Sequence, residues 1–129
     1  MARIVLDASA LLAMMQSEPG GDRVERLLLD PEQTVLVSTL NWSEVFDRML
    51  RSGIPEQAVE KLLGRLDLET VDFDQEMAKA AALLRIIVPA LSLADRACLA
   101  LASSRKAAAW TTDKSWSRAS VSAKVVVLR

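Results

Sequence analysis

Four acidic residues stand where predicted strands end or predicted helices begin, namely Asp7, Glu44, Asp95 and Asp113. Asp7 and Asp113 each follow a short run of strand-forming residues, while Glu44 and Asp95 each lie in the first turn of a helical pattern. Ligands of open α/β sheets bind beyond the carboxyl ends of the strands, so acids at these ends are candidates for binding or catalysis.

Each of these acids also has a structural explanation when it is taken alone. An acid at the third position of a helix reaches back to the cap amide, and an acid after a strand caps a helix or closes a turn. The corresponding assignments are capping boxes for Ser92-x-x-Asp95 and Asn41-x-x-Glu44, a helix N-cap for Asp7 and a turn for Asp113.

If the four carboxylates converge at one edge of a sheet, a role in binding or catalysis is favoured over the separate structural explanations. Two like charges about 4 Å apart, at an effective dielectric near 20, repel each other by roughly 4 kcal/mol, so such a cluster needs protons or a divalent cation. Oxygen ligands without His or Cys select Mg²⁺ or Mn²⁺. The four acids together therefore predict a Mg²⁺ or Mn²⁺ site.

The composition excludes several other kinds of active site. The chain has 129 residues, with no His and a single Cys. These counts rule out a Ser-His-Asp triad, a Cys-His pair, a His-liganded or thiolate-cluster zinc site and an intramolecular disulfide. The remaining chemistry must use carboxylates, hydroxyls, Lys, Arg or a metal held by oxygen.

Strand-like and helical segments alternate along the chain, whose hydrophobic content of 51% is too high for disorder. We expect strands at residues 3–6, 35–37, 66–71, 107–111 and 124–128, and helices at residues 10–16, 22–29, 41–51, 74–87 and 92–105, with one more helix opening at 54–55. This order predicts an α/β fold in a single domain, residues 1–129, with a parallel sheet covered by helices on both faces.

Charge and hydropathy limit the setting in which the chain acts. No apolar run reaches the ~18 residues that a membrane span needs, and Asp7 interrupts the first apolar run, so we expect a cytoplasmic protein. The net charge of −1 argues against a protein that coats nucleic acid. Residues 96–129, however, carry seven basic residues against Asp113 alone, which is either a solvated surface or an edge that faces phosphate or a partner.

Four segments that contain these acids resemble the PIN domain of VapC-type toxins from bacterial toxin–antitoxin pairs. They are residues 5–13 around Asp7, 42–45 around Glu44, 91–102 around Asp95 and 111–116 around Asp113. The segment 91–102 is the most specific of the four. Two residues depart from the family pattern without removing a carboxylate: Ala94, where Gly is common, and Lys114, where Arg is common.

The resemblance implies a three-layer α/β/α sandwich with a mostly parallel sheet of four to five strands. It also implies a Mg²⁺- or Mn²⁺-dependent endoribonuclease that cleaves RNA, forms a homodimer and is inhibited by a cognate VapB-type antitoxin. By the same resemblance, the catalytic and metal-binding residues are the acidic quartet Asp7, Glu44, Asp95 and Asp113.

The expected reaction is hydrolysis of an RNA phosphodiester by metal-activated water, which leaves a 5′-phosphate and a 3′-hydroxyl. In this hypothesis Asp7, Asp95 and Asp113 are the more direct ligands. Glu44 either binds a second metal or orients the water.

Several neighbouring side chains have two interpretations each. The hydroxyls of Ser9 and Thr112 either fix the carboxylates or bond the local backbone. Arg96 either touches the substrate phosphate or pairs with a neighbouring carboxylate.

The large apolar side chains are open to two interpretations in the same way. Three tryptophans either stack on unpaired bases or pack in the core: Trp42, Trp110 and Trp116. A helical stripe either enters the core or meets a partner: Phe46, Met49 and Leu50.

Two other classes of protein fit part of this pattern. A phosphoacceptor receiver domain has a similar length and a Mg²⁺-binding acidic pocket, but it expects paired acids after the first strand, and here Asp7 is followed by Ala8. A catalytically silent binding module with the same fold is the other alternative, and four intact acids argue against it.

Overall fold

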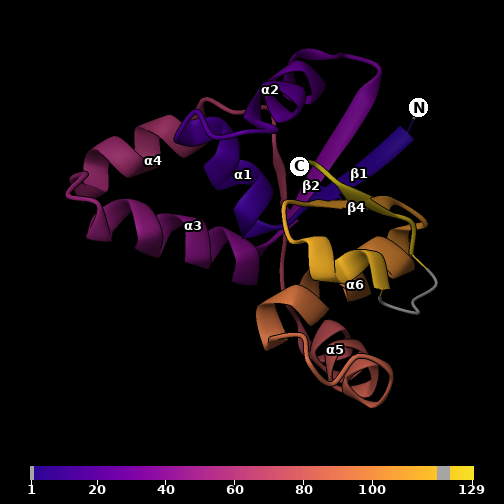
Figure 1. The fold of residues 1–129 in the computed structure, drawn as a ribbon. Helices are drawn as coiled ribbons and strands as arrows, with labels where there is room; N and C mark the ends of the chain where they lie inside the picture. The colour runs from indigo at the N-terminus through magenta and orange to yellow at the C-terminus, as the bar shows by residue number, and fades with distance from the viewer. Residues whose placement is uncertain (1, 119–122) are drawn as a thin grey trace.

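Parallel strands form the central sheet of the molecule, in the order β3-β2-β1-β4-β5 (Figure 1). A computed structural model describes residues 2–118 and 123–129 of the chain. The strands are β1 (Ala2–Leu6), β2 (Gln33–Ser38), β3 (Glu69–Val71), β4 (Ala108–Thr111) and β5 (Val125–Val127). All four neighbouring pairs are parallel, as the alternation of strands and helices predicts.

Helices cover both faces of this sheet and complete a three-layer α/β/α sandwich (Figure 1). On one side lie α1 (Ala8–Met15), α2 (Gly21–Leu29), α3 (Thr39–Arg51) and α4 (Glu56–Gly64), and on the other lie α5 (Gln75–Ile87) and α6 (Leu93–Arg105). A short 3-10 helix, η1 (Lys114–Arg118), follows β4. The predicted fold class is confirmed.

The alternation of side chains along β1 divides the core into two clusters. Leu6 packs on the side of α1 to α4 with Leu11 and Val45, and Val5 packs on the side of α6 with Leu99. Because successive strand residues point to opposite faces, one short apolar strand serves both layers.

Strand β1 lies at the point where the strand order reverses. From β1 the chain proceeds to β2 and β3 on one side, and it returns later to β4 and β5 on the other. Ligands of open α/β sheets bind outside the carboxyl ends of the strands at such a switch point. The ends of β1 and β4, which Asp7 and Asp113 follow, therefore bound the expected binding region.

A tight turn joins α1 to α2 and depends on two glycines. Gly20 has a positive φ of 92°, and a Cβ on Gly21 would clash with the carbonyl oxygen of Ala13. A larger residue at position 21 would force α1 and α2 apart.

Several predicted boundaries differ from the observed ones. The third strand is shorter than the predicted 66–71, because Leu66 and Leu68 pack against the core from a loop and only Glu69–Val71 pairs with β2. Helix α3 begins at Thr39, earlier than predicted. The end of the predicted polar segment before β5, residues 119–122, lies outside the described residues.

None of the described helices is long and apolar enough to span a membrane.

Candidate active site

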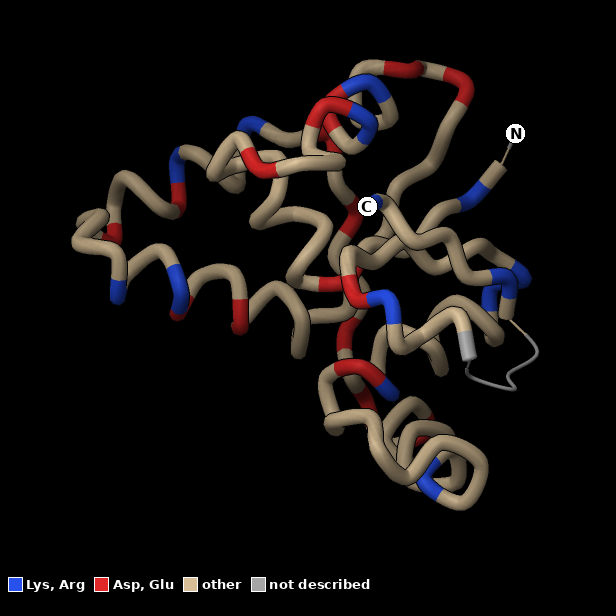
Figure 2. Tube along the Cα trace, in the orientation of Figure 1, with Lys and Arg blue, Asp and Glu red and all other residues tan. Residues whose placement is uncertain are grey.

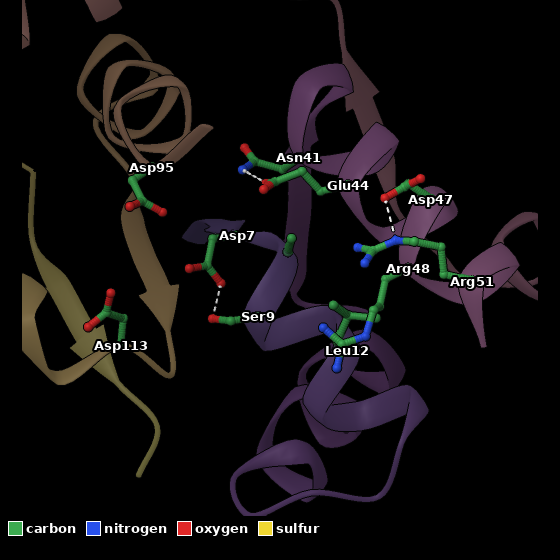
Figure 3. A pocket seen from close by; sticks show the side chains of 11 residues that line it. Asp7, Ser9, Leu12, Asn41, Glu44, Asp47, Arg48, Arg51, Asp95 and Asp113 are labelled. Atoms are coloured by element: carbon green, nitrogen blue, oxygen red, sulfur yellow. Dashed lines mark hydrogen bonds and ion pairs between the residues drawn. The ribbon is translucent and has the colours of Figure 1, made fainter. Parts of the chain in front are cut away.

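The four predicted acids come together in one pocket at the carboxyl edge of the sheet (Figure 3). The pocket has a volume of about 300 Å³. Its acidic lining residues come from the end of β1, from α3, from α6 and from the segment after β4: Asp7, Glu44, Asp47, Asp95 and Asp113. Residues far apart in sequence thus meet because parallel strands end at the same edge.

Asp7 is the most buried of the four, with 4% of its surface exposed. It caps α1, since its Oδ1 accepts hydrogen bonds from the Ala10 amide at 2.8 Å and from Ser9 Oγ at 2.7 Å. Its Oδ2 accepts a hydrogen bond from Thr111 Oγ1 at 2.5 Å. These donors hold the carboxylate in one orientation, so Asp7 is a cap and a pocket residue at once.

The hydroxyls around Asp7 are only partly those that the sequence indicates. Ser9 donates to the carboxylate as expected, but the side chain that completes the network is that of Thr111, not Thr112. Thr112 contributes its backbone amide, which donates to Ser9 Oγ at 3.0 Å. The alternation of buried and less buried residues along β4 could have indicated Thr111. Ala109 and Thr111 are the two buried residues of this strand, and a buried hydroxyl needs a hydrogen-bond partner.

Glu44 is held by Asn41, which lies three residues earlier on α3. Asn41 Nδ2 donates to Glu44 Oε1 at 3.2 Å and to the carbonyl oxygen of Ala94 at 3.0 Å, so one amide links α3 to the start of α6. The predicted Asn41-x-x-Glu44 capping box is therefore wrong. Ser38 caps this helix instead, because its Oγ accepts a hydrogen bond from the Leu40 amide at 3.3 Å.

Asn41 is a site residue that the sequence interpretation assigned to another role. Only 1% of its surface is exposed, and its buried Oδ1 has no hydrogen-bond partner among residues 2–118 and 123–129. The spacing of Asn41, Val45 and Met49, the buried residues of α3, was the signal that could have found it. A polar residue in a buried helical stripe must be bonded across the interface.

Asp95 and Asp113 have both the structural and the pocket positions that the sequence predicts. Ser92 Oγ accepts a hydrogen bond from the Asp95 amide at 3.1 Å, and Asp95 Oδ2 accepts one from the Ser92 amide at 3.2 Å, which confirms this capping box. Asp113 Oδ1 accepts a hydrogen bond from the Ser115 amide at 2.9 Å in a turn. In both residues, one carboxylate oxygen makes no hydrogen bond to the described residues.

The electrostatics show that these carboxylates act on one another. Burial raises the pKa of Asp7 from 3.8 to about 6. Hydrogen bonds from Thr111, Ser9 and Ala10 oppose this rise of the pKa, and the charge of Asp95 adds to it. Burial also raises the pKa of Glu44, with the bond from Asn41 opposing the shift and the charge of Asp95 adding to it.

The same acids also affect the pKa of the Cys98 thiol on α6. Cys98 is fully buried, and burial raises the pKa of its thiol well above the usual value. The negative charges of Asp7, Asp95 and Glu44 raise it further. Three acids from three elements therefore converge on one region of the structure.

Comparison with known proteins identifies the family to which this architecture belongs. The sequence profile of the PIN domain matches residues 4–121, which is most of the chain. The chain belongs to the PIN domain family. Among curated protein sequences, none matches it significantly.

Solved structures of toxin–antitoxin proteins share the fold of this PIN domain. A toxin–antitoxin complex from Klebsiella pneumoniae matches with a TM-score of 0.76 and 19% identity, over 98% of each chain. DNA-bound VapBC from Salmonella typhimurium matches with a TM-score of 0.77 and 18% identity, over 100% of each chain. Mycobacterium tuberculosis VapC20, described as a toxin that cleaves the sarcin–ricin loop, matches with a TM-score of 0.70 and 18% identity, over 92% of this chain and 95% of that chain.

The donor set of the PIN-domain pocket suits a hard divalent cation, because the candidate ligands are all oxygens. Among the described residues, no three acidic or thiol side chains lie close enough to hold one ion together. Mg²⁺ typically takes only one or two carboxylates and completes its shell with water and substrate phosphate. The residues present therefore fit such an ion, and the metal-binding role of the four acids stays a prediction.

Arg96 and the other described basic residues of the segment 96–129 do not line the acidic pocket. The Arg96 guanidinium donates from Nη1 to the carbonyl oxygen of Ala81 at 2.8 Å and from Nε to that of Leu91 at 3.4 Å. Of its two interpretations, the ion pair with a carboxylate is thus wrong, since Arg96 joins α6 to α5 through backbone carbonyls. Other basic residues, namely Arg105, Lys106 and Lys124, line a groove at the amino ends of the strands.

The three tryptophans of this PIN domain differ in exposure. Trp116 is fully buried in the core on the α6 side, which excludes it as a platform for bases. Trp42 and Trp110 are partly buried against the other cluster, where Trp42 contacts Phe46 and Arg23 lies over Trp110. In the stripe on α3, Met49 is buried and Leu50 is 41% exposed, so the stripe is divided between core and surface.

Proposed function

We propose that the chain is a divalent-metal-dependent endoribonuclease, formed as one PIN domain over residues 1–129, and the toxin of a VapBC-type pair. The observation that carries this proposal is the meeting of Asp7, Glu44, Asp95 and Asp113 in one pocket at the switch point of the sheet. Metal-assisted hydrolysis of a phosphodiester needs such a set of oxygen ligands and requires no histidine.

Each acid has a role in this proposal that follows from its surroundings. Asp7, Asp95 and Asp113 would be the more direct ligands, with one or two of these carboxylates on the cation itself and the others reaching it through bound water. Hydrogen bonds from neighbouring amides and hydroxyls hold the three carboxylates in place before substrate arrives. A divalent cation bound there, Mg²⁺ or Mn²⁺, supplies positive charge for the phosphate and lowers the pKa of a water molecule. Glu44, held by Asn41, orients the attacking water from the α3 wall or binds a second cation.

The products follow from attack by water at phosphorus. The water oxygen forms the new bond to phosphorus, the bond to the 3′ oxygen breaks, and the 3′ oxygen takes a proton. RNA cut in this way carries a 5′-phosphate and a 3′-hydroxyl, whereas nucleases that use the ribose 2′-hydroxyl leave a cyclic phosphate.

The partners in the proposal are an RNA substrate, a VapB-type antitoxin and a second copy of the chain in a homodimer. Several similar solved structures are toxin–antitoxin complexes, which supports an antitoxin partner. An enzyme that acts on cellular RNA is expected to work in the cytoplasm.

The first test is cleavage of total bacterial RNA by the purified protein with Mn²⁺, with EDTA and with Asp95→Asn. We expect cleavage with Mn²⁺ that leaves 5′-phosphates, no cleavage with EDTA, and a fall of at least about 100-fold in the variant. Asn at position 95 keeps an oxygen that can accept the Ser92 amide, so the helix cap survives and the loss reports on chemistry.

The matched control is Asp22→Asn, which removes an exposed acid paired with Arg26 on α2, outside the pocket. We expect this variant to cleave RNA and to arrest growth on expression as the wild type does, and Asp95→Asn to do neither. Cyclic phosphate ends, or cleavage that persists in EDTA, would contradict the mechanism. No cleavage by folded, inhibitor-free protein would favour a binding module whose acids serve as caps.

A further inference from the structure

We propose that the guanidinium of Arg48 forms a phosphate subsite, which binds a phosphate of the RNA strand next to the one that is cut. This inference rests on the proposed nuclease function and adds the recognition of the strand that flanks the reacting group. Its basis is an unpaired cation in the wall of an acidic pocket.

Arg48 lines the same pocket as the four acids and lies one helical turn after Glu44 on α3. Figure 3 shows its side chain beside Leu12, across the pocket from Asp95 and Asp113. A phosphate bound by Arg48 would therefore lie next to the metal-binding carboxylates rather than among them.

The usual partner of Arg48 is occupied elsewhere. Glu and Arg four residues apart on a helix normally pair. Here Glu44 Oε1 accepts a hydrogen bond from Asn41, whose buried amide is itself tied to α6. Glu44 is thereby turned toward the acids of the pocket and away from Arg48.

The other acid on this wall is also paired. Asp47 Oδ2 forms an ion pair with Arg51 Nε at 3.0 Å. Within the described part of the chain, the Arg48 side chain makes neither an ion pair nor a hydrogen bond. It is thus the unengaged cation among the described residues that line the pocket.

The charge balance of the pocket shows why a free cation is useful there. Five carboxylates and two guanidiniums line it, and one of these guanidiniums is already paired. A strand of RNA brings one negative charge per nucleotide into this field, and a single metal serves only the phosphate that reacts. The planar guanidinium of Arg48 matches a neighbouring phosphate with two parallel hydrogen bonds.

A carboxylate of an acidic peptide would also fit a guanidinium. RNA is the favoured occupant because the reacting phosphate, once bound at the acids, brings the next phosphate of the same strand within reach of the α3 wall. An acidic peptide has no corresponding group that anchors it at the carboxylates.

The binding test uses a fluorescein-labelled single-stranded RNA of mixed sequence, with anisotropy measured in EDTA over a range of salt concentrations. We expect Arg48→Gln to raise Kd about fivefold and to reduce the slope of log K against log salt by about 0.7. Arg48→Lys keeps the charge without the planar fork and should recover part of the affinity.

The matched control is Arg65→Gln, which removes an exposed arginine at the end of α4 that lines none of the pockets described. We expect it to change Kd less than about twofold. If Arg65→Gln and Arg48→Gln raised Kd equally, the subsite would be overturned, because Arg48 would then contribute only to the overall attraction between protein and RNA. RNA binding that is insensitive to Arg48, combined with Arg48-dependent binding of deca-glutamate, would assign the residue to an acidic peptide instead.

Cleavage kinetics with Mn²⁺ separate this inference from the proposed function. Loss of a contact made equally in the ground and transition states raises KM and leaves kcat near the wild-type value. Arg48→Gln should show that pattern, whereas Asp95→Asn should lose kcat. If the wild type binds RNA through Arg48 but never cuts it, the nuclease function fails and the subsite stands. If the wild type cuts RNA and Arg48→Gln leaves KM unchanged, the subsite fails and the function stands.

Discussion

The carboxylate of Asp7 combines a structural and a chemical role at a cost in stability. It caps α1 and bonds Thr111 across the sheet, yet it is 4% exposed and lies in the field of Asp95. The described residues around it supply hydrogen bonds but no positive charge. Such an acid is poorly stabilised in its ionised form until a cation arrives.

Asp7 should therefore make the metal-free protein less stable as the pH rises. The pKa of Asp7 is about 6 in the folded chain against its ordinary value of 3.8, so the folded state binds the proton more tightly than the unfolded state. The Asp7 contribution to stability is full below about pH 4 and is lost as the pH rises through about 6, a change of about 3 kcal/mol. About half of this fall, about 1.4 kcal/mol, lies between pH 5 and pH 7.5, where urea unfolding in EDTA measures it.

Asp7→Asn is the control for this pH dependence. The amide cannot ionise, and Thr111 can turn its hydroxyl to accept from it, so the network adapts. The difference in unfolding free energy between wild type and variant should change with pH. A difference that stays constant from pH 5 to pH 7.5 would show that Asp7 does not titrate in this range.

The buried amide of Asn41 links helices α3 and α6. Asn41 bonds Glu44 on its own helix and the Ala94 carbonyl at the start of α6, next to Asp95. The relative position of two of the proposed catalytic acids thus depends on one side chain that touches neither the substrate nor the metal in the proposed mechanism.

Asn41→Leu should weaken both stability and activity. The substitution keeps the branched shape of the side chain but leaves the Ala94 carbonyl without its partner, which costs about 2 kcal/mol. It also releases Glu44 to pair with Arg48 one turn later, so we expect kcat to fall and KM to rise. Urea unfolding and single-substrate kinetics measure the two effects.

Ser38→Ala serves as the control for the coupling of α3 and α6. It removes the N-cap of α3 and costs about 1 kcal/mol, but it leaves the Asn41 bonds in place. We expect kcat per folded molecule to stay at the wild-type value. If Asn41→Leu also kept its kcat, the amide would be structural only.

The elements were predictable from the sequence where apolar periodicity was strong, as in β1 and α6. The meeting of the four acids in one pocket was predictable because the same patterns show where strands end and helices start. The N-cap of α3 was not, because Ser38 and Asn41 are both good caps and only the backbone decides between them. The burial of Trp116 was left undecided because its polar sequence neighbours do not reveal the core beneath η1.

At the scale of the whole molecule, the two edges of the sheet carry opposite charge. Figure 2 shows acidic positions near the carboxyl ends of the strands and basic positions at the turn between α6 and β4. The acidic edge lines the pocket, and the basic groove lies at the amino ends with Arg3 and Arg105. Because most basic residues of the groove lie at the other edge, the five carboxylates of the pocket are neutralised by only two guanidiniums there.

A divalent cation should therefore stabilise the entire fold. Ligands that bind only the folded state add RT ln(1 + [L]/Kd), which is about 2.7 kcal/mol at 100 times Kd. For a chain of 129 residues this corresponds to a rise in Tm of about 10 °C with Mn²⁺ or Mg²⁺. Thermal unfolding followed by circular dichroism, in EDTA and across a Mn²⁺ titration, measures the shift.

The same experiment on Asp95→Asn distinguishes a specific site from general screening of charge. Removal of this charge relieves repulsion with Asp7 and Glu44, so the metal-free variant should melt at or above the wild-type temperature. Because a proposed ligand is lost, the shift with Mn²⁺ should shrink or vanish, while NaCl at matched ionic strength should give neither protein the full shift. Asp22→Asn should keep the wild-type response, since that acid lies outside the pocket. An equal Mn²⁺ shift in wild type and Asp95→Asn would mean that the cation binds elsewhere, and that these acids meet at the carboxyl edge without forming the metal site.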